Sequence, residues 1–213
     1  MKFIAIDIGN VLCTVNAQPF LENLSETFNI TIQEAQYFLK RFQRVHDLGH
    51  TTMEDELREK FNVKSKIIIN KMVQSWNNSI MPYIPILDKF NELKSKHNLQ
   101  VALLSNIGIE HAEMMEEKLK HNGFFSDAIK HFSCDVGIRK PSSIFYQSFI
   151  LQYPKFKGCL YVDDLEENLI AGSKFEFKPF KFDLDETLSV ADKILEIEKI
   201  IIEQPIVKNS RWH

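Results

Sequence analysis

Short apolar segments alternate with amphipathic segments along most of the chain. Strands are predicted over residues 2–7, 99–105, 127–133, 158–164 and 175–183. The middle three are mostly continuous apolar runs, as expected of strands that are buried on both faces. Helical patterns lie between the strands, at roughly 84–97, 109–121, 141–152, 165–173 and 187–203. Strands that alternate with helices predict an α/β fold with a doubly wound parallel sheet.

Residues 16–81 interrupt this alternation, because they contain amphipathic helical segments and no convincing strand. One of these helices is predicted to begin with a capping box formed by Thr51 and Glu54. The two prolines of "MPYIP" (81–85) predict a stiff return to the sheet. We therefore expect two units, a sheet core of residues 1–15 and 82–213 and an inserted helical unit of residues 16–81.

Composition narrows the class of protein. Hydrophobic residues make up 44% of the chain and charged residues 26%, with a formal net charge of -3. These values are typical of a globular domain and favour neither nucleic acid nor an anionic membrane as a partner. The cysteines are three and scattered, the N-terminus lacks a signal-peptide pattern, and no apolar run reaches membrane-spanning length. A cytoplasmic protein is expected, while the oligomeric state is not indicated.

Polar side chains follow the predicted strands. They are Asp7 after the first strand, Ser105 and Asn106 after the second, Lys140 after the third, and Asp163, Asp164 and Asn168 after the fourth. Each alone would also fit a turn or a helix cap. However, ligands bind beyond the carboxyl ends of parallel strands, so we expect these side chains at one edge of the sheet. Clustered carboxylates need a cation, and oxygen ligands suit Mg²⁺. An amine beside a hydroxyl and free backbone N–H groups suits phosphate.

These four positions resemble, in order and over nearly the whole chain, the four motifs of the haloacid dehalogenase (HAD) superfamily. "DIGNVL" and "GIRKP" are especially similar to the subgroup that contains bacterial glucose-1-phosphate phosphatases. The insertion after the first strand falls where that family places its helical cap. The resemblance implies a HAD-like Rossmannoid core with an α-helical cap. It also implies a magnesium-dependent phosphatase of small phosphorylated metabolites, such as sugar phosphates, that works through an aspartyl-phosphate.

The resemblance also assigns roles to individual residues. Asp7 would be the nucleophile. The magnesium ligands would come from Asp7, the Gly9 carbonyl, Asp163, Asp164 and Asn168. The phosphoryl oxygens would be held by Ser105, the Asn106 backbone N–H and Lys140, of which Lys140 would also act in catalysis. The cap would choose the leaving group, and we expect Arg44 or His46 to face the site from it. Trp76, Phe38 and Phe42 are expected in the hydrophobic interior of the cap.

Gly9 departs from the common pattern of the superfamily. Most of its phosphatases carry a second aspartate two residues after the nucleophile, which acts as general acid and base. The glucose-1-phosphatase-like subgroup also has glycine here. General acid catalysis contributes about 10²- to 10⁴-fold, so we expect slow turnover or a leaving group that departs easily.

Two other functions remain open. A metal-free dehalogenase of small haloacids would use the same aspartate and tolerate Gly9, but it would have to hold Asp163 and Asp164 uncompensated. A degenerate member of the superfamily that binds a ligand without turnover would account for the missing acid.

A second motif competes with Asp7. "DLDETL" (183–188) resembles the nucleophile motif of the polymerase-tail phosphatases. The tail after Thr187 contains one predicted helix and no strand, so it has no room for the later motifs. We therefore predict that Asp183 ends the fifth strand and that Asp185 or Thr187 caps the next helix.

Overall fold

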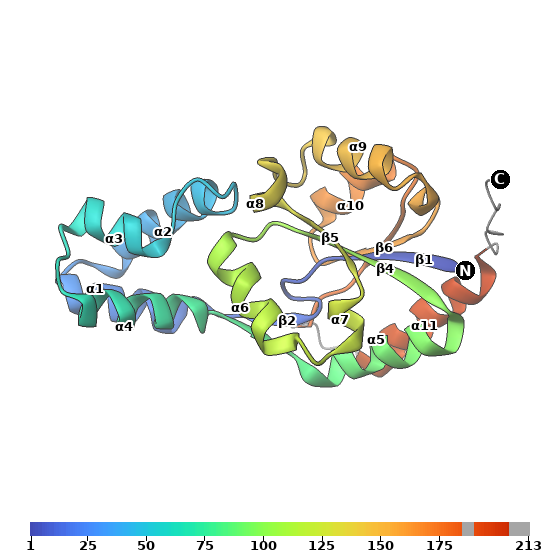
Figure 1. Ribbon diagram of the computed structural model, residues 1–213, viewed down its shortest axis with the longest axis horizontal. Helices are drawn as coiled ribbons and strands as arrows, with labels where there is room; N and C mark the ends of the chain where they lie inside the picture. The colour runs from blue at the N-terminus through green and yellow to red at the C-terminus, as the bar shows by residue number, and fades with distance from the viewer. Residues whose placement is uncertain (185–189, 205–213) are drawn as a thin grey trace.

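A parallel sheet of five strands forms the centre of the molecule (Figure 1). The computed structural model describes residues 1–184 and 190–204. The strand order is β5-β4-β1-β6-β7, and every neighbouring pair runs parallel. The strands are β1 (Lys2–Ile6), β4 (Leu99–Ser105), β5 (Ile129–Phe132), β6 (Leu160–Asp163) and β7 (Lys178–Lys181). This confirms the predicted α/β fold.

Helices cover both faces of the sheet, and side chains on both faces of the central strands are buried beneath them. In β1, Ile4 and Ile6 belong to one hydrophobic cluster while Phe3 and Ala5 belong to the other. The first cluster includes α5 (Ile84–His97), α6 (Ile109–Leu119), α7 (Gly123–Ser126) and α11 (Val190–Glu203). The second includes α9 (Ser143–Gln152), the 3₁₀ turn η1 (Pro154–Phe156) and α10 (Glu166–Ser173). The short helix α8 (Ser133–Val136) follows β5.

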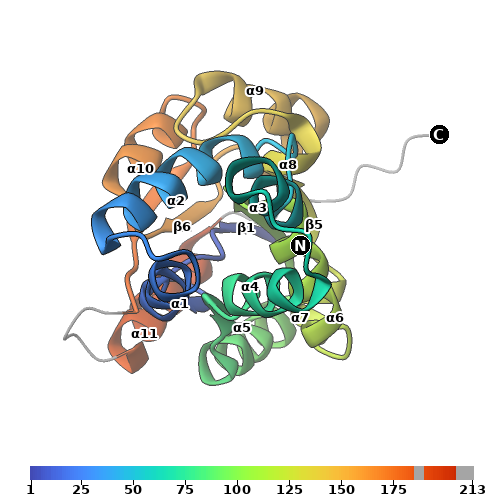
Figure 2. The same cartoon turned by 90° about the vertical axis from the view of Figure 1, so that its left-hand side faces the viewer.

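Four helices lie beyond the carboxyl end of β1, and Figure 2 views the molecule from their side. They are α1 (Gln18–Phe28), α2 (Ile32–His46), α3 (Met53–Phe61) and α4 (Lys66–Asn77). These helices enclose a hydrophobic cluster of their own, in which Phe20, Phe42 and Trp76 are buried and Phe38 is partly buried. The amphipathic segments of residues 16–81 therefore fold as helices around a shared interior. The division of the chain into a core and a cap stays a prediction.

The two chain segments that connect the sheet to the four helices pair with each other as short strands. β2 (Cys13–Val15) and β3 (Ile80–Pro82) form an antiparallel ribbon in which Val15 lies opposite Ile80. The expectation that residues 16–81 contain no strand is therefore wrong at Ile80 and Met81. A three-residue strand is too short to show alternation, and its pairing depends on the other segment lying beside it.

The predicted capping box at the start of α3 is also wrong, by one residue. Thr52 caps this helix by accepting a hydrogen bond from the Asp55 N–H at 3.1 Å, whereas Glu54 pairs with Arg58. A complete capping box, absent from our expectations, begins α2 with Thr31 and Glu34. Two adjacent threonines offer two registers, and the packing of the helix selects one.

The chain after the sheet contains the competing motif. β7 ends at Lys181, so Asp183 lies just beyond that strand, whereas Asp185 and Thr187 lie outside the described residues. α9 begins at Ser143, later than expected, so Lys140 precedes the helix in a loop. Among the helices of residues 1–184 and 190–204, none is both long and apolar enough to cross a membrane.

Candidate active site

Three carboxylates meet where β1 and β6 end. Asp7 directly follows β1, Asp163 is the last residue of β6, and Asp164 comes next. The two strands are neighbours, with Ile6 opposite Val162, so their ends coincide. One oxygen from each carboxylate lies within 4.8 Å of the others. The structure thus brings together three of the residues expected at the metal site.

Lys140 reaches this cluster from the loop after β5. Its Nζ lies 2.7 Å from Asp163 Oδ2 and 3.0 Å from Asp7 Oδ1, and it also donates to the Leu104 carbonyl at 2.7 Å. The contact with Asp7 is an ion pair without the angles of a hydrogen bond. Asn106 holds the lysine backbone on both sides, accepting from its N–H at 2.8 Å and donating to its carbonyl at 3.0 Å. The loop is therefore tied to the end of β4, where Ser105 is buried.

Asp163 is saturated with hydrogen bonds. One oxygen accepts from Lys140 and from the Tyr161 hydroxyl, and the other accepts from the Leu165 N–H at 2.9 Å and from Asn168 Nδ2 at 3.0 Å. This carboxylate is fully buried and orients both the lysine and the first turn of α10. It therefore organises the cluster, and its lone pairs are largely used.

Asp7 and Asp164 keep more of their capacity to bind a ligand. Asp164 is half-buried and accepts one hydrogen bond from Asn10 Nδ2, at 3.1 Å. Asp7 Oδ1 and Asn168 Oδ1 are buried with no hydrogen-bond partner among the described residues. Orphaned buried oxygens of this kind are expensive unless a cation or water satisfies them. An all-oxygen set in which Asn168 Oδ1 has no partner and Asp7 Oδ1 has only the ion pair with Lys140 fits a hard divalent cation such as Mg²⁺.

Electrostatics supports the same interpretation. Burial raises the pKa of Asp7 from 3.8 to about 7, with repulsion from Asp163 and Asp164 adding to the shift and Lys140 opposing it. Burial also raises the pKa of Asp164. Burial disfavours the charge of Lys140, but Asp7 and Asp163 outweigh it and hold the lysine pKa above its ordinary value. Three carboxylates therefore share one lysine, and a bound cation would supply the further positive charge.

Replacing Lys140 with methionine is expected to lower the free energy of unfolding by about 3–5 kcal/mol, because the buried Asp163 would lose its cation. Chemical denaturation at neutral pH measures this change. Lys89→Met is the matched control, since Lys89 pairs with Glu92 on the surface and such pairs contribute at most about 1 kcal/mol. Equal stability of the two variants would show that Lys140 does not hold the cluster together.

A cavity of about 110 Å³ lies between the residues that follow β1 and β4 and the helices. Gly9, Ser105 and Asn106 line it on the side of the sheet. On the opposite side the helical unit contributes four polar residues, which are Gln43, Asp47, Trp76 and Ser79. The cavity therefore connects the predicted phosphate-binding residues to the helices that were expected to choose the substrate.

The structure does not bring Arg44 or His46 into this cavity. Arg44 is exposed, and His46 is fully buried against α6 and the loop before it. Gln43 and Asp47 line the cavity instead, and they lie four residues apart on one face of α2. That spacing was visible in the sequence, but which face of α2 turns toward the sheet depends on its packing.

His46 packs closely against Gly108 and Glu110, at the start of α6. Its Nε2 lies 3.2 Å from Glu110 and its Nδ1 lies 3.5 Å from Asp47, and these carboxylates outweigh burial and raise the pKa of the histidine. A Cβ atom placed on Gly108 would lie only 2.0 Å from His46 Cε1. Asp47 also pairs with Arg139, at 2.9 Å. His46 and Asp47 thus join the helices to the sheet.

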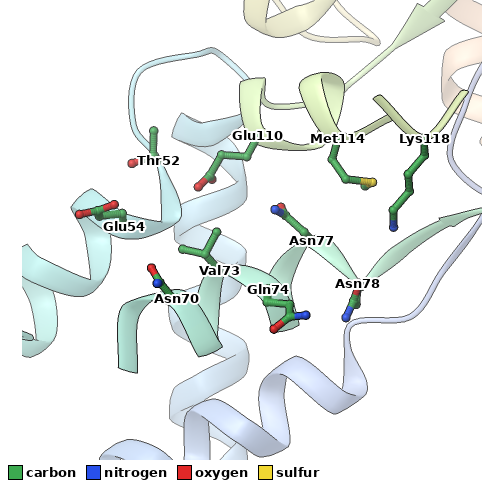
Figure 3. A pocket seen from close by; sticks show the side chains of 10 residues that line it. All are labelled: Thr52, Glu54, Asn70, Val73, Gln74, Asn77, Asn78, Glu110, Met114 and Lys118. Atoms are coloured by element: carbon green, nitrogen blue, oxygen red, sulfur yellow. The ribbon is translucent and has the colours of Figure 1, made fainter. Parts of the chain in front are cut away.

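A larger cavity of about 480 Å³ lies between α3, α4 and α6 (Figure 3). Asn77, Glu110 and Met114 surround it, and none of the predicted site residues lines it. Its acidic groups are already engaged, Glu54 by Arg58 and Glu110 by His46 and the Met53 N–H. The smaller cavity, which Gly9, Ser105 and Asn106 line, is therefore the better candidate for a substrate site.

Asp183 is not part of the carboxylate cluster formed by the described residues. The chain at this point is fixed by the N–H of Leu184, which donates to the Asn10 carbonyl at 2.9 Å. Asp183 and Leu184 thus lie at the same edge of the sheet, but Asp7 is the aspartate that lies beside both Lys140 and Asp164.

No protein-family model matches the chain, and no curated protein matches it by sequence. Solved structures do match. The HAD family enzyme BT-2542 of Bacteroides thetaiotaomicron, in complex with magnesium and inorganic phosphate, has a TM-score of 0.73 and 17% identity. That match covers 89% of this chain and 98% of the enzyme.

Two further structures have the same fold. A predicted HAD-like family hydrolase from Porphyromonas gingivalis has a TM-score of 0.71 and 19% identity, over 92% of this chain and 98% of its own. A dehalogenase with an intermediate complex has a TM-score of 0.61 and 13% identity, over 96% of this chain and 98% of its own. The chain therefore has the fold of the HAD enzymes.

Proposed function

We propose that the protein is a magnesium-dependent phosphatase of small phosphorylated metabolites, sugar phosphates among them, and a member of the HAD superfamily. The observation that carries this proposal is the juxtaposition of Asp7, Asp164 and Lys140, together with a cavity that Gly9, Ser105 and Asn106 line. Asp7, the carboxylate nucleophile, lies beside the carboxylate Asp164, which is suited to a cation, and beside the amine of Lys140, which is suited to an anion. The likeness to the glucose-1-phosphate phosphatase subgroup stays a prediction.

Each residue has a role in this proposal. Asp7 attacks phosphorus and displaces the alcohol to form an aspartyl-phosphate, which water then hydrolyses to phosphate and free Asp7, so that one difficult step becomes two. Ser105, the Asn106 N–H and Lys140 hold the phosphoryl oxygens as negative charge develops on them. Mg²⁺ would be held by Asp7, Asp164 and the Gly9 carbonyl, with Asp163 and Asn168 in support. When bound, it would neutralise charge on the phosphate and on Asp7.

The helical unit of α1–α4 would act as a cap. It supplies one side of the cavity, so a substrate enclosed there is shielded from water while it reacts. Residue 9, which lines the cavity, is glycine and has no carboxyl group that could protonate a leaving group. Turnover of esters with poor leaving groups should therefore be slow.

Dehalogenation remains the second candidate, because a dehalogenase shares the fold and the reaction also uses an aspartate nucleophile. The three clustered carboxylates argue against it, since Lys140 alone would have to compensate all of them in a metal-free site. The complex of BT-2542 with magnesium and inorganic phosphate supports the phosphatase.

Phosphate release from an aryl phosphate, with and without Mg²⁺, tests the proposal. We expect release that depends on the metal and stops with a chelator. Turnover of a haloacid without metal would favour the dehalogenase. Tight binding of phosphate without any turnover would favour a degenerate, non-catalytic protein.

Mg²⁺ affinity is expected to fall as the pH drops below about 7. Asp7 has a pKa raised to about 7 in the metal-free protein, so below that pH it must lose a proton before it can bind the cation. The loss approaches tenfold per pH unit for each proton released. Calorimetric titration between about pH 5.5 and 8 measures it, and Asp7→Asn should flatten the dependence. A pH-independent affinity in the parent protein would contradict the assignment of Asp7 as a ligand.

A further inference from the structure

We infer that the cap selects a phosphate ester whose alcohol portion is small, uncharged and hydroxylated, and that Asp47 and Trp76 recognise it. This inference rests on the proposed function, because it assumes that phosphate occupies the end of the cavity near Ser105 and Asn106. It concerns the opposite end, where the helical unit supplies the lining.

The size of the cavity limits the leaving group. Its volume is about 110 Å³, whereas pockets for drug-sized ligands measure about 300–1,000 Å³. The phosphoryl group takes part of that space. The remainder suits an alcohol of a few carbon atoms, and a nucleoside or a peptide side chain with its backbone would not fit.

The described residues that line the cavity give a second anionic group of the substrate no cation with which to pair. Asp47 lines the cavity, and its carboxylate is held by Arg139 at 2.9 Å and lies 3.5 Å from His46. No lysine or arginine lines the cavity among the described residues, and burial lowers the pKa of His111 to about 4, which keeps it neutral. Carboxylates only accept hydrogen bonds, so Asp47 favours a hydroxyl and repels another carboxylate or phosphate.

Trp76 supplies a donor that the protein leaves unused. Its side chain is 2% exposed and lines the cavity, yet its Nε1–H has no hydrogen-bond partner among the described residues. The indole is fixed by stacking on His111, with ring centroids 4.3 Å apart, and His111 Nε2 lies 3.1 Å from the Trp76 carbonyl. A buried N–H without a partner costs free energy, which an oxygen of the ligand would recover.

Asp47, Trp76 and Gln43 together offer hydrogen-bond donors and acceptors that suit the hydroxyl groups of a ligand. Asp47 only accepts hydrogen bonds, the Trp76 indole only donates, and the Gln43 carboxamide does both. A hydroxyl can serve each of them, because it donates and accepts at once. An apolar leaving group would leave the Trp76 donor and the Asp47 carboxylate unsatisfied.

Steady-state kinetics of the full-length protein with Mg²⁺ and three substrates test the inference. Acetyl phosphate reports the basic reaction, glycerol 3-phosphate carries the neutral polyol, and 3-phosphoglycerate replaces one alcohol with a carboxylate. We expect kcat/KM for glycerol 3-phosphate to exceed that for 3-phosphoglycerate by about tenfold or more. Asp47→Asn should narrow this ratio by about tenfold, since it removes the repelling charge.

Trp76→Phe keeps an aromatic ring and deletes only the N–H. It should raise KM for glycerol 3-phosphate more than for acetyl phosphate, because only the polyol reaches the indole. Asp88→Asn is the matched control for Asp47→Asn, since Asp88 is exposed on α5 and should leave all three substrates unchanged. Thermal melting verifies that each variant is folded.

A second readout does not depend on the variants at Asp47 and Trp76. The chain has two tryptophans, so in a Trp212→Phe protein the fluorescence comes from Trp76 alone. We expect glycerol 3-phosphate to change this emission saturably. Failure to hydrolyse acetyl phosphate would overturn the proposed function and this inference with it. Hydrolysis of acetyl phosphate together with equal kcat/KM for the other two substrates, or with unchanged Trp76 emission, would overturn the inference alone.

Discussion

Replacing Asp7 with asparagine is expected to abolish phosphate release, a loss of roughly 10³-fold or more. An amide oxygen is a poor nucleophile, and no other described carboxylate combines contact to Lys140 with a buried oxygen that lacks a hydrogen bond. The fold should persist, because the substitution is isosteric and removes repulsion with Asp163 and Asp164. Release of phosphate from an aryl phosphate at saturating Mg²⁺ measures the loss.

Asp183→Asn is the matched control for this variant. Asp183 follows β7 at the same edge of the sheet but lies outside the carboxylate cluster of the described residues. We expect it to cost at most about 1–2 kcal/mol of stability, the value of a lost cap, and to leave turnover almost unchanged. Near-normal activity of Asp7→Asn, or catalytic collapse of a folded Asp183→Asn protein, would show that the wrong aspartate was assigned as nucleophile.

Introducing aspartate at Gly9 is expected to accelerate the hydrolysis of alkyl phosphates, with a ceiling of about 10²- to 10⁴-fold. Gly9 lines the cavity, and its φ lies outside the left-handed region that would strain a side chain. A Cβ there would meet only Val15 Cγ2, at the ordinary distance of 3.5 Å. The new carboxyl would stand beside Asp7 and Asp164, whose charges would raise its pKa and keep a proton available for the leaving group.

The choice of substrates separates acid catalysis from other effects. Alkyl phosphates have poor leaving groups and should gain most, whereas aryl phosphates depart without help and should gain little. Gly9→Asn has nearly the same shape and no proton to transfer, so it should give no gain on either class. Equal losses on both classes in a folded Gly9→Asp protein that binds Mg²⁺ would mean that another group already acts as the acid.

The sheet and the carboxylate cluster were predictable because both follow from local patterns. Apolar runs define the strands, and in a parallel sheet the residues after each strand must lie at one edge. The pairing of Ile6 with Val162 then brings Asp7 and Asp163 together without any further information. The polymerase-tail-like motif does not share this arrangement, because Asp183 is outside the carboxylate cluster of the described residues.

The features that escaped prediction depend on contacts between distant segments. The apolar pattern of α2 describes its interior face but not which polar residues turn toward the sheet, so Arg44 and His46 were expected where Gln43 and Asp47 lie. Likewise, the four hydrogen bonds that saturate Asp163 come from residues on three segments. No spacing along the chain distinguishes that carboxylate from Asp164.

The close fit of His46 against Gly108 makes the contact between the helices and the sheet sensitive to a single added methyl group. An added Cβ at position 108 would overlap the imidazole, so any residue other than glycine disfavours this arrangement of the two units. If only this arrangement binds substrate, the apparent dissociation constant rises in inverse proportion to the population of that arrangement. Position 108 would thus set affinity through an equilibrium between conformers, while the carboxylates that carry the chemistry remain as they are.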